Sequence, residues 1–273
     1  MNQRRGRKRR DEEWEKSDLH GWGHDPKKVK FLALESRYCF ALLSSIFHEL
    51  IFLHKALIAT EPDKKAPDFV IAAHISQSTT LMRILAGKIW EARTRMNDPV
   101  MSKTLREEFF PLIPGQAQRW KGLNRAIASA SWLATLRNHH AFHFPTYDQI
   151  AHRLASNWPI PGGTVLGPSP GNCFFYDADQ AMMLALLETA SREFDDKRTL
   201  IREFAVVLGS LYRMSTQLAA LLSETLITFV KERLWDGKRT VPFGRIDELK
   251  HQSETLPYFV RPSANDAQGV PAE

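Results

Sequence analysis

The sequence contains little cysteine and no long uninterrupted hydrophobic run. Its two cysteines, Cys39 and Cys173, are too few and too far apart for a disulfide framework or a CxxC metal site. An acidic segment follows the basic amino terminus, which argues against a secretory signal. The most apolar window, residues 38–59, is interrupted by polar and charged residues, which favours a buried core helix over a membrane span. We therefore expect a cytoplasmic protein without a membrane segment.

The sequence also lacks the glycine-rich motifs of several enzyme classes. It has no GxxxxGK[ST] phosphate loop, no GxGxxG fingerprint after a strand and no GxSxG elbow. Nucleotide-driven enzymes and serine hydrolases are therefore disfavoured. Alternating Val, Ile and Thr residues are scarce, whereas Leu and Ala are abundant, which predicts a mostly helical protein.

Basic charge is concentrated at the amino terminus. The formal net charge is +6, and residues 1–10 contain six basic groups and no acidic one. The rest of the chain is balanced, with 31 basic and 31 acidic residues. We expect residues 1–27 to form a disordered tail, which is either simply solvated or contacts nucleic acid or another acidic surface.

Apolar residues that recur at alternating steps of three and four predict long helices. The predicted ranges are about 28–60, 67–97, 116–142 and 197–235. Two shorter helices are expected, one around 102–109 and one that begins near the capping residues Asp177 and Asp179. The pattern predicts an all-α protein, an antiparallel bundle of four to six helices over residues 28–259. Residues 260–273 are expected to form a second disordered tail.

Each predicted helix carries its apolar residues on one stripe. In the first helix the stripe comprises Cys39, Leu43, Ile46, Leu50, Leu53 and Leu57. In the last helix it comprises Phe204, Leu208, Leu211, Ser215, Leu218, Leu222, Thr225 and Phe229. The stripe of the helix at 116–142 changes from bulky residues to alanines and then includes Arg137, an unusual position for a charged side chain.

Residues 145–177 are rich in proline and glycine and are predicted to be an irregular loop inserted in the bundle. Within this loop we expect a small hairpin that pairs residues 164–165 with residues 173–175. Long loops of this kind within a compact domain are usually lids or flexible insertions.

Just before this loop, seven residues combine one arginine, one amide and three histidines. The segment runs from Arg137 to His143 and ends near Pro145, which stops a helix at the residue before it. An arginine fork can hold phosphate oxygens, and a histidine can transfer protons near neutral pH. We hypothesise that Arg137 binds a scissile phosphate and that His143 acts as general acid and base. Asn138 would position the substrate and His139 would assist.

Arg137-Asn138 followed by His143 matches a motif of HEPN-fold proteins, R-x(4–6)-H with a polar residue after the arginine. The chain resembles this family over about ten residues. The resemblance implies a helical bundle that acts as a metal-independent endoribonuclease of a toxin–antitoxin or defence system. It also implies a homodimer in which two motifs share one cleft, cleavage that leaves a cyclic phosphate, and RNA and an antitoxin protein as partners. The chain departs from the family because it is much longer than a minimal HEPN domain and a Pro/Gly-rich loop follows the motif.

Two other interpretations of the motif remain open. His139 and His143 are four residues apart, the spacing of zinc ligands on one helix face, but no third ligand can be named. We expect no metal and no other cofactor. Alternatively, the motif stabilises the helix end in a non-catalytic module that binds RNA or protein. On an ideal helix, residues 137 and 143 point about 120° apart, so a shared phosphate would require a helix-end distortion or a partner's helix.

Overall fold

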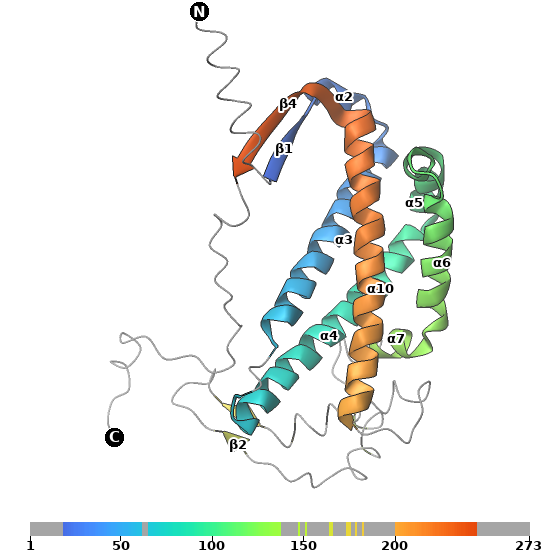
Figure 1. The fold of residues 1–273 in the computed structure, drawn as a ribbon. Coiled ribbons are helices and arrows are strands. Elements are labelled where there is room, and N and C mark those ends of the chain that lie inside the picture. The colour runs from blue at the N-terminus through green and yellow to red at the C-terminus, as the bar shows by residue number, and fades with distance from the viewer. Residues whose placement is uncertain are drawn as a thin grey trace, which may run out of the picture. The chain divides into compact units, whose positions relative to one another are not determined.

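The structure is a computed structural model of the 273-residue chain, drawn in Figure 1. It describes residues 19–61, 65–137, 147, 151, 164–165, 173–175, 178, 182 and 200–244. The described residues form two compact units. Unit 1 is drawn from residues 1–45, 96–120 and 220–253, and unit 2 from residues 46–95, 121–219 and 254–273.

The all-α class predicted from the sequence is confirmed. The long helices are α3 (Leu34–Ala59), α4 (Asp68–Met96), α6 (Gln116–Ser129) and α10 (Leu200–Phe229). The short helix expected around 102–109 is also present, as α5 (Pro99–Thr104) followed by a π-helical turn, Leu105–Phe109.

The predicted apolar stripes form the core. Along α3 the buried residues are Cys39, Leu43, Leu50 and Leu53, and along α10 they include Leu211, Ser215, Leu218, Leu222, Thr225 and Phe229. Burial of one stripe per helix explains why apolar periodicity located these helices so well.

Judged by length and composition alone, Leu34–Ala59 and Ala205–Leu234 would each suffice to cross a bilayer.

The core of unit 1 is built on three aromatic rings. The ring of Phe229, at the end of α10, stacks on Phe109 with centroids 4.0 Å apart and planes 10° apart. Phe40 of α3 stacks on the Phe229 ring as well, with ring centroids 5.7 Å apart. Phe109 and Phe229 are fully buried. The stack therefore links α3, α10 and the π-helical turn Leu105–Phe109.

A buried amide joins α6 to α10 in unit 1. The Nε2 group of Gln116 donates hydrogen bonds to the carbonyl oxygen of Leu221 at 3.0 Å and to Thr225 Oγ1 at 2.9 Å. Gln116 Oε1 accepts one from Arg119, which also pairs with Glu224. Because Gln116 is completely buried, its polar atoms depend on these partners.

A second polar contact in unit 1 lies beside Cys39. The Ser36 hydroxyl donates to Glu108 Oε2 at 2.5 Å. Ser36 and Cys39 are both fully buried. Burial raises the pKa of the Cys39 thiol to about 12, and the nearby Glu108 carboxylate adds to the rise.

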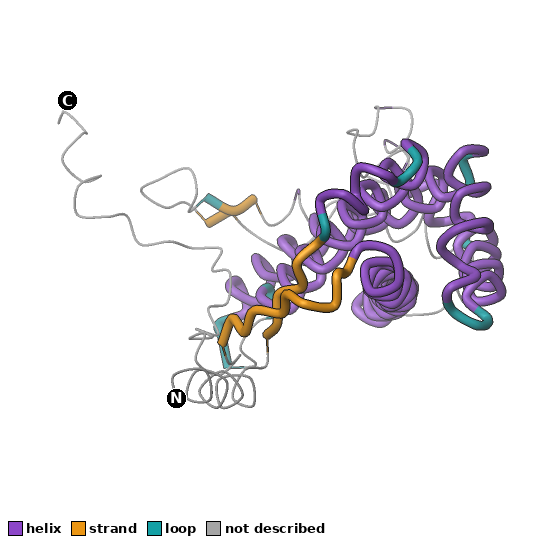
Figure 2. The backbone as a smooth tube through the Cα atoms, turned by 90° about the horizontal axis from the view of Figure 1, so that it is seen from above, coloured by secondary structure: helices purple, strands orange, loops and turns teal. Residues whose placement is uncertain are grey.

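Residues 19–27, which were expected to belong to a disordered tail, form a strand and the start of a short helix. Strand β1 (Leu19–His24) pairs in antiparallel fashion with β4 (Trp235–Gly244), and the two strands run side by side as orange tubes in Figure 2. The ladder runs from the pair Leu19 and Gly244 to the pair His24 and Trp235, with irregularities near both ends. The short helix α2 (Pro26–Phe31) follows, so the first predicted helix is interrupted before α3 begins.

Backbone contacts fix α2 to the end of the helical segment that precedes β4. Asp25 accepts a hydrogen bond from the Lys27 amide and caps α2, while its own amide donates to the Leu234 carbonyl oxygen. Lys28 Nζ donates to the Trp235 carbonyl oxygen at 2.6 Å. The predicted last helix, about 197–235, ends as expected, because α10 and a π-helical turn, Val230–Leu234, lead directly into β4.

In unit 2 the predicted hairpin within the Pro/Gly-rich segment is present. Strand β2 (Thr164–Val165) pairs in antiparallel fashion with β3 (Phe174–Phe175). Of the helix expected to begin near Asp177, residues 178 and 182 are described and both are helical. Both predicted tails, apart from residues 19–27, lie outside the described residues.

Replacing Gln116 by Ala is expected to lower the free energy of unfolding by about 2–4 kcal/mol, because it removes a buried side chain and its hydrogen bonds to Leu221 and Thr225. Chemical denaturation measures the change. Gln118→Ala is the matched control, because Gln118 lies in the same turn of α6 but is exposed, and it should change stability by less than about 0.5 kcal/mol. Equal effects of the two substitutions would contradict the role of the buried amide.

Alkylation by iodoacetamide is expected to spare Cys39 in the folded protein. At about pH 8.5 an ordinary thiol is half ionised, but Cys39 is buried and its pKa is raised to about 12, so little thiolate is present and none is accessible. Half-buried Cys173 is the internal control. Mass spectrometry should find Cys39 modified only after denaturation, and modification of both thiols at equal rates in the folded state would refute this expectation.

Candidate functional site

The helix that carries the predicted site is broken. The sequence predicted one helix over about 116–142, but α6 ends at Ser129 and α7 (Ser131–Leu136) begins after Ala130, whose backbone leaves the helical region with φ −79° and ψ 79°. Figure 1 shows that α7 turns away from α6 at this point. No proline or glycine marks the break. The burial of Trp132, Leu133 and Leu136 that it permits outweighs the helix propensity of the local sequence.

Arg137 lies at the carboxyl-terminal end of α7. It keeps helical dihedral angles, and its backbone amide donates to the carbonyl oxygens of Leu133 and Ala134. Its side chain is exposed, whereas the preceding Leu136 is fully buried. The backbone at Arg137 is therefore anchored by the helix, and the residue lies at its exposed end. The other predicted site residues, Asn138, His139 and His143, lie outside the described residues.

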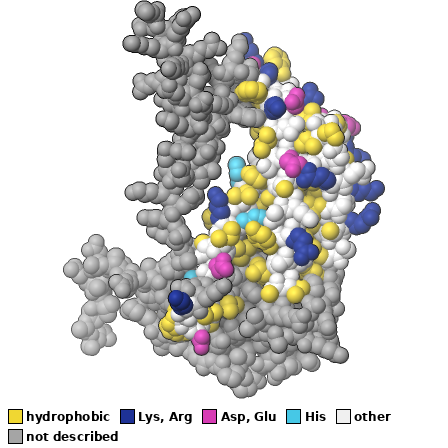
Figure 3. All heavy atoms as spheres, viewed as in Figure 1, with side chains coloured by type: hydrophobic (Ala, Val, Ile, Leu, Met, Phe, Trp, Pro, Cys, Tyr) yellow, Lys and Arg dark blue, Asp and Glu magenta, His cyan; other side chains and the backbone are white. Residues whose placement is uncertain are grey.

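Other basic side chains of unit 2 lie on α6 and on the last turn of α4. Lys121 and Arg125 are exposed, and α6 contains no acidic residue. Arg93 and Arg95 occupy the last turn of α4. Figure 3 shows Lys and Arg side chains along the edge of the molecule where α6 lies. We call these four residues the basic face; such a concentration of positive charge favours anionic partners.

A polar contact fixes one side of the basic face. Arg93 Nε donates to Asn124 Oδ1 at 2.9 Å and thereby joins α4 to α6. The Arg93 guanidinium also lies 5.1 Å from the centre of the Trp90 ring, within cation–π range. Trp120 and Trp132 are buried and Trp90 is half-buried.

Metal chemistry gains no support from the described part of the chain. Within it, no three His, Cys, Asp or Glu side chains converge as metal ligands do. His139 and His143, on which the zinc interpretation rests, lie outside this part. Two of the described histidines have other partners: His74 Nδ1 lies 3.2 Å from the Thr60 carbonyl oxygen, and His54 contacts the ring of Tyr212.

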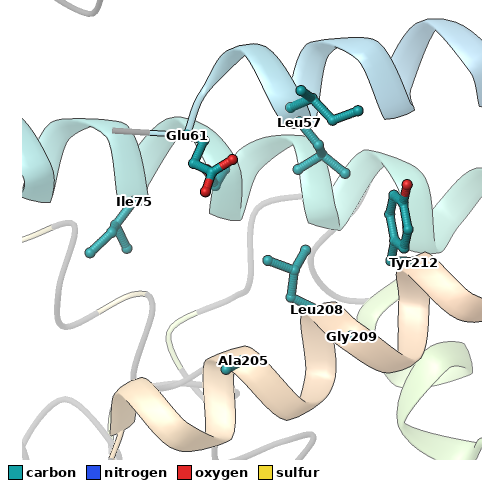
Figure 4. A pocket seen from close by; sticks show the side chains of 9 residues that line it. Leu57, Glu61, Ile75, Ala205, Leu208, Gly209 and Tyr212 are labelled. Carbon is teal, nitrogen blue, oxygen red and sulfur yellow. The ribbon is translucent and has the colours of Figure 1, made fainter. Parts of the chain in front are cut away.

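A cavity in unit 2 is the feature that sequence reasoning missed. It has a volume of 460 Å³ and lies among residues of α3, α4 and α10, with Glu61 just beyond the end of α3 (Figure 4). One signal of it was present in the sequence, because Ala205 and Gly209 place two small residues beside the apolar stripe of α10. Small residues leave space where larger ones would fill the core.

Comparison of the chain with protein-family models, with curated proteins and with solved structures found no match. The chemistry of the described residues and the motif that begins at Arg137 are therefore the features that point to a function.

Proposed function

We propose that the protein is a metal-independent endoribonuclease with a HEPN-like helical bundle, working as a cytoplasmic homodimer in a toxin-like or defence-like system. The observation that carries the proposal is the exposed guanidinium of Arg137, held at the end of α7 by a buried helix and followed in sequence by Asn138, His139 and His143. RNA is the substrate, and an antitoxin protein is the proposed partner that restrains the activity.

The proposed reaction needs only groups that the motif supplies. The ribose 2′-hydroxyl attacks the adjacent phosphorus as His143 takes its proton, and the bond to the 5′-oxygen of the next nucleotide breaks. A second histidine, from the motif of the other subunit, returns a proton to that oxygen. The products are a 2′,3′-cyclic phosphate and a 5′-hydroxyl. Arg137 stabilises the additional negative charge on the phosphoryl oxygens, Asn138 positions the substrate and His139 assists.

The basic face supports this assignment. Lys121 and Arg125 on α6, with Arg93 and Arg95 on α4, offer positive charge to a ribose-phosphate backbone. Arg93 is further held by Asn124 and Trp90, so its guanidinium is restrained in position before any RNA binds. Restraint of this kind reduces the entropy lost on binding.

Cleavage of a mixed RNA pool in excess EDTA tests the proposal. We expect wild-type protein to leave 2′,3′-cyclic phosphate ends, and Arg137→Ala and His143→Ala each to lower the rate by at least about 100-fold, because transition-state charge stabilisation and proton transfer are lost. Product ends are identified by mass spectrometry. Arg106→Ala is the matched control, because Arg106 is exposed on the π-helical turn of unit 1 and bonds only locally to the Ser102 carbonyl oxygen.

Equal cleavage by wild type and both motif variants would refute the proposal and indicate a contaminating nuclease. RNA binding without cleavage by any of the proteins would instead support the alternative, a non-catalytic helical module that binds RNA or protein through the same surface. Circular dichroism of each variant establishes that the helical fold is intact.

A further inference from the structure

The cavity of unit 2 has walls from three helices. Leu57 and Ile58 of α3, Ile75 and Ser78 of α4, and Ala205, Leu208, Gly209 and Tyr212 of α10 line it, together with Glu61. Its volume of 460 Å³ falls within the range of about 300–1,000 Å³ that is usual for small-molecule sites. In Figure 4 the Leu208 side chain points from α10 into the space that the Glu61 carboxylate enters from the other side.

The lining separates into a large apolar part and a small polar part. Leu, Ile, Ala and Gly residues make up most of the wall. Among the lining residues of the described chain, Glu61 is the one that carries a charge at neutral pH, and it is exposed. A ligand that fills the cavity would therefore bury an apolar body and keep one polar end beside Glu61, at the entrance.

The entrance is held in place by a polar network between α3 and α4. Thr60, which directly precedes Glu61, shares a hydrogen bond of 2.8 Å with Ser78 of the cavity wall. The Thr60 carbonyl oxygen lies 3.2 Å from Nδ1 of buried His74. The Glu61 amide donates to the Ile58 carbonyl oxygen and continues the helix end. The carboxylate is thus attached to a fixed backbone, although the side chain itself reaches solvent.

Two features at this entrance attract a cation, the Glu61 carboxylate and the carboxyl-terminal end of α3. Helix α3 contains 26 residues and ends at Ala59, so its negative dipole end lies beside Glu61. The last turn of α3 contains no basic residue to offset that end. Tyr212 lines the cavity, and the centre of its ring lies 5.0 Å from the centre of the His54 ring. Burial lowers the pKa of His54, which disfavours a positive charge on this ring beside a bound cation.

We propose that this cavity is a binding site for an amphiphilic amine. The apolar chain of the ligand lies against Leu57, Ile75 and Leu208, and its ammonium group lies at the Glu61 carboxylate and the end of α3. Arg137 is not among the residues that line the cavity, and the inference stands independently of the proposed nuclease activity.

Isothermal titration calorimetry of the full chain with dodecylamine, below its micellar concentration, tests the site. We expect saturable binding with one site per chain, at least about fivefold tighter than binding of dodecanol. Shortening the chain from dodecylamine to decylamine and octylamine should weaken binding by up to about fourfold per methylene removed. Dodecanoate should bind more weakly than dodecanol, because Glu61 and the end of α3 repel its carboxylate.

Two variants locate the binding. Gly209→Phe should weaken dodecylamine binding at least about tenfold, since Gly209 lines the cavity and an added Cβ there meets no atom within 4 Å, so the backbone accepts a side chain whose ring occupies ligand space. Gly122→Phe is the matched control, because Gly122 is another helical glycine with open space around it, on α6 and away from the cavity lining. Glu61→Gln should weaken dodecylamine about two- to fivefold and leave dodecanol unchanged.

Several results would overturn the proposal: no saturable binding of dodecylamine, equal binding by Gly209→Phe and Gly122→Phe, or binding of dodecanoate as tight as that of dodecylamine. Analytical sedimentation of the same proteins provides one more result that would overturn it. If wild type is a dimer that Gly209→Phe alone dissociates, the occupant of the cavity is a second copy of the chain and the small-ligand assignment is wrong. Failure of any of these tests leaves the EDTA-resistant cleavage assay unaffected.

Discussion

Unit 1 depends on the stacked rings of Phe229, Phe109 and Phe40. Aromatic pairs of this geometry contribute about 0.5–1.5 kcal/mol each beyond the area they bury. Their position matters more than this energy, because Phe229 ends α10 and Phe109 ends a π-helical turn. With Phe109 fixed, the adjacent Glu108 reaches Ser36 of α3. With Phe229 fixed, the chain enters β4 at the point where β1 and Asp25 can pair with it.

The sequence predicted the long helices well because a one-sided apolar stripe is a local signal. Leu43 and Leu50 of α3, and Leu218 and Leu222 of α10, lie in the core as their spacing indicates. The pairing of β1 with β4 was not predictable, because its partners are more than 200 residues apart and the segment LHGWGH has no apolar alternation. The break at Ala130 also depends on tertiary packing, since nothing in the local sequence stops the helix there.

Arg137 and the cavity, the two candidate sites of unit 2, differ in how far the sequence alone predicts them. Arg137 was identifiable because its side-chain chemistry is unusual in an alanine-rich stripe, and its exposure at the end of α7 agrees with a role in binding anions. The cavity is a property of space between helices. Gly209 and Ala205 hint at it, but the approach of Glu61 to α10 residues requires the three-dimensional fold.

Cross-linking with an uncleavable RNA tests most directly whether the end of α7 is an RNA site. An oligonucleotide with 2′-methoxy groups and 4-thiouridine bases cannot undergo the proposed attack, so it should remain bound during irradiation. Mass spectrometry of the linked peptides should place the cross-links in the peptides that contain Arg137 and residues of the basic face. Cross-links confined to the six basic residues of segment 1–10 would contradict the assignment, because RNA would then bind only through the amino-terminal charge.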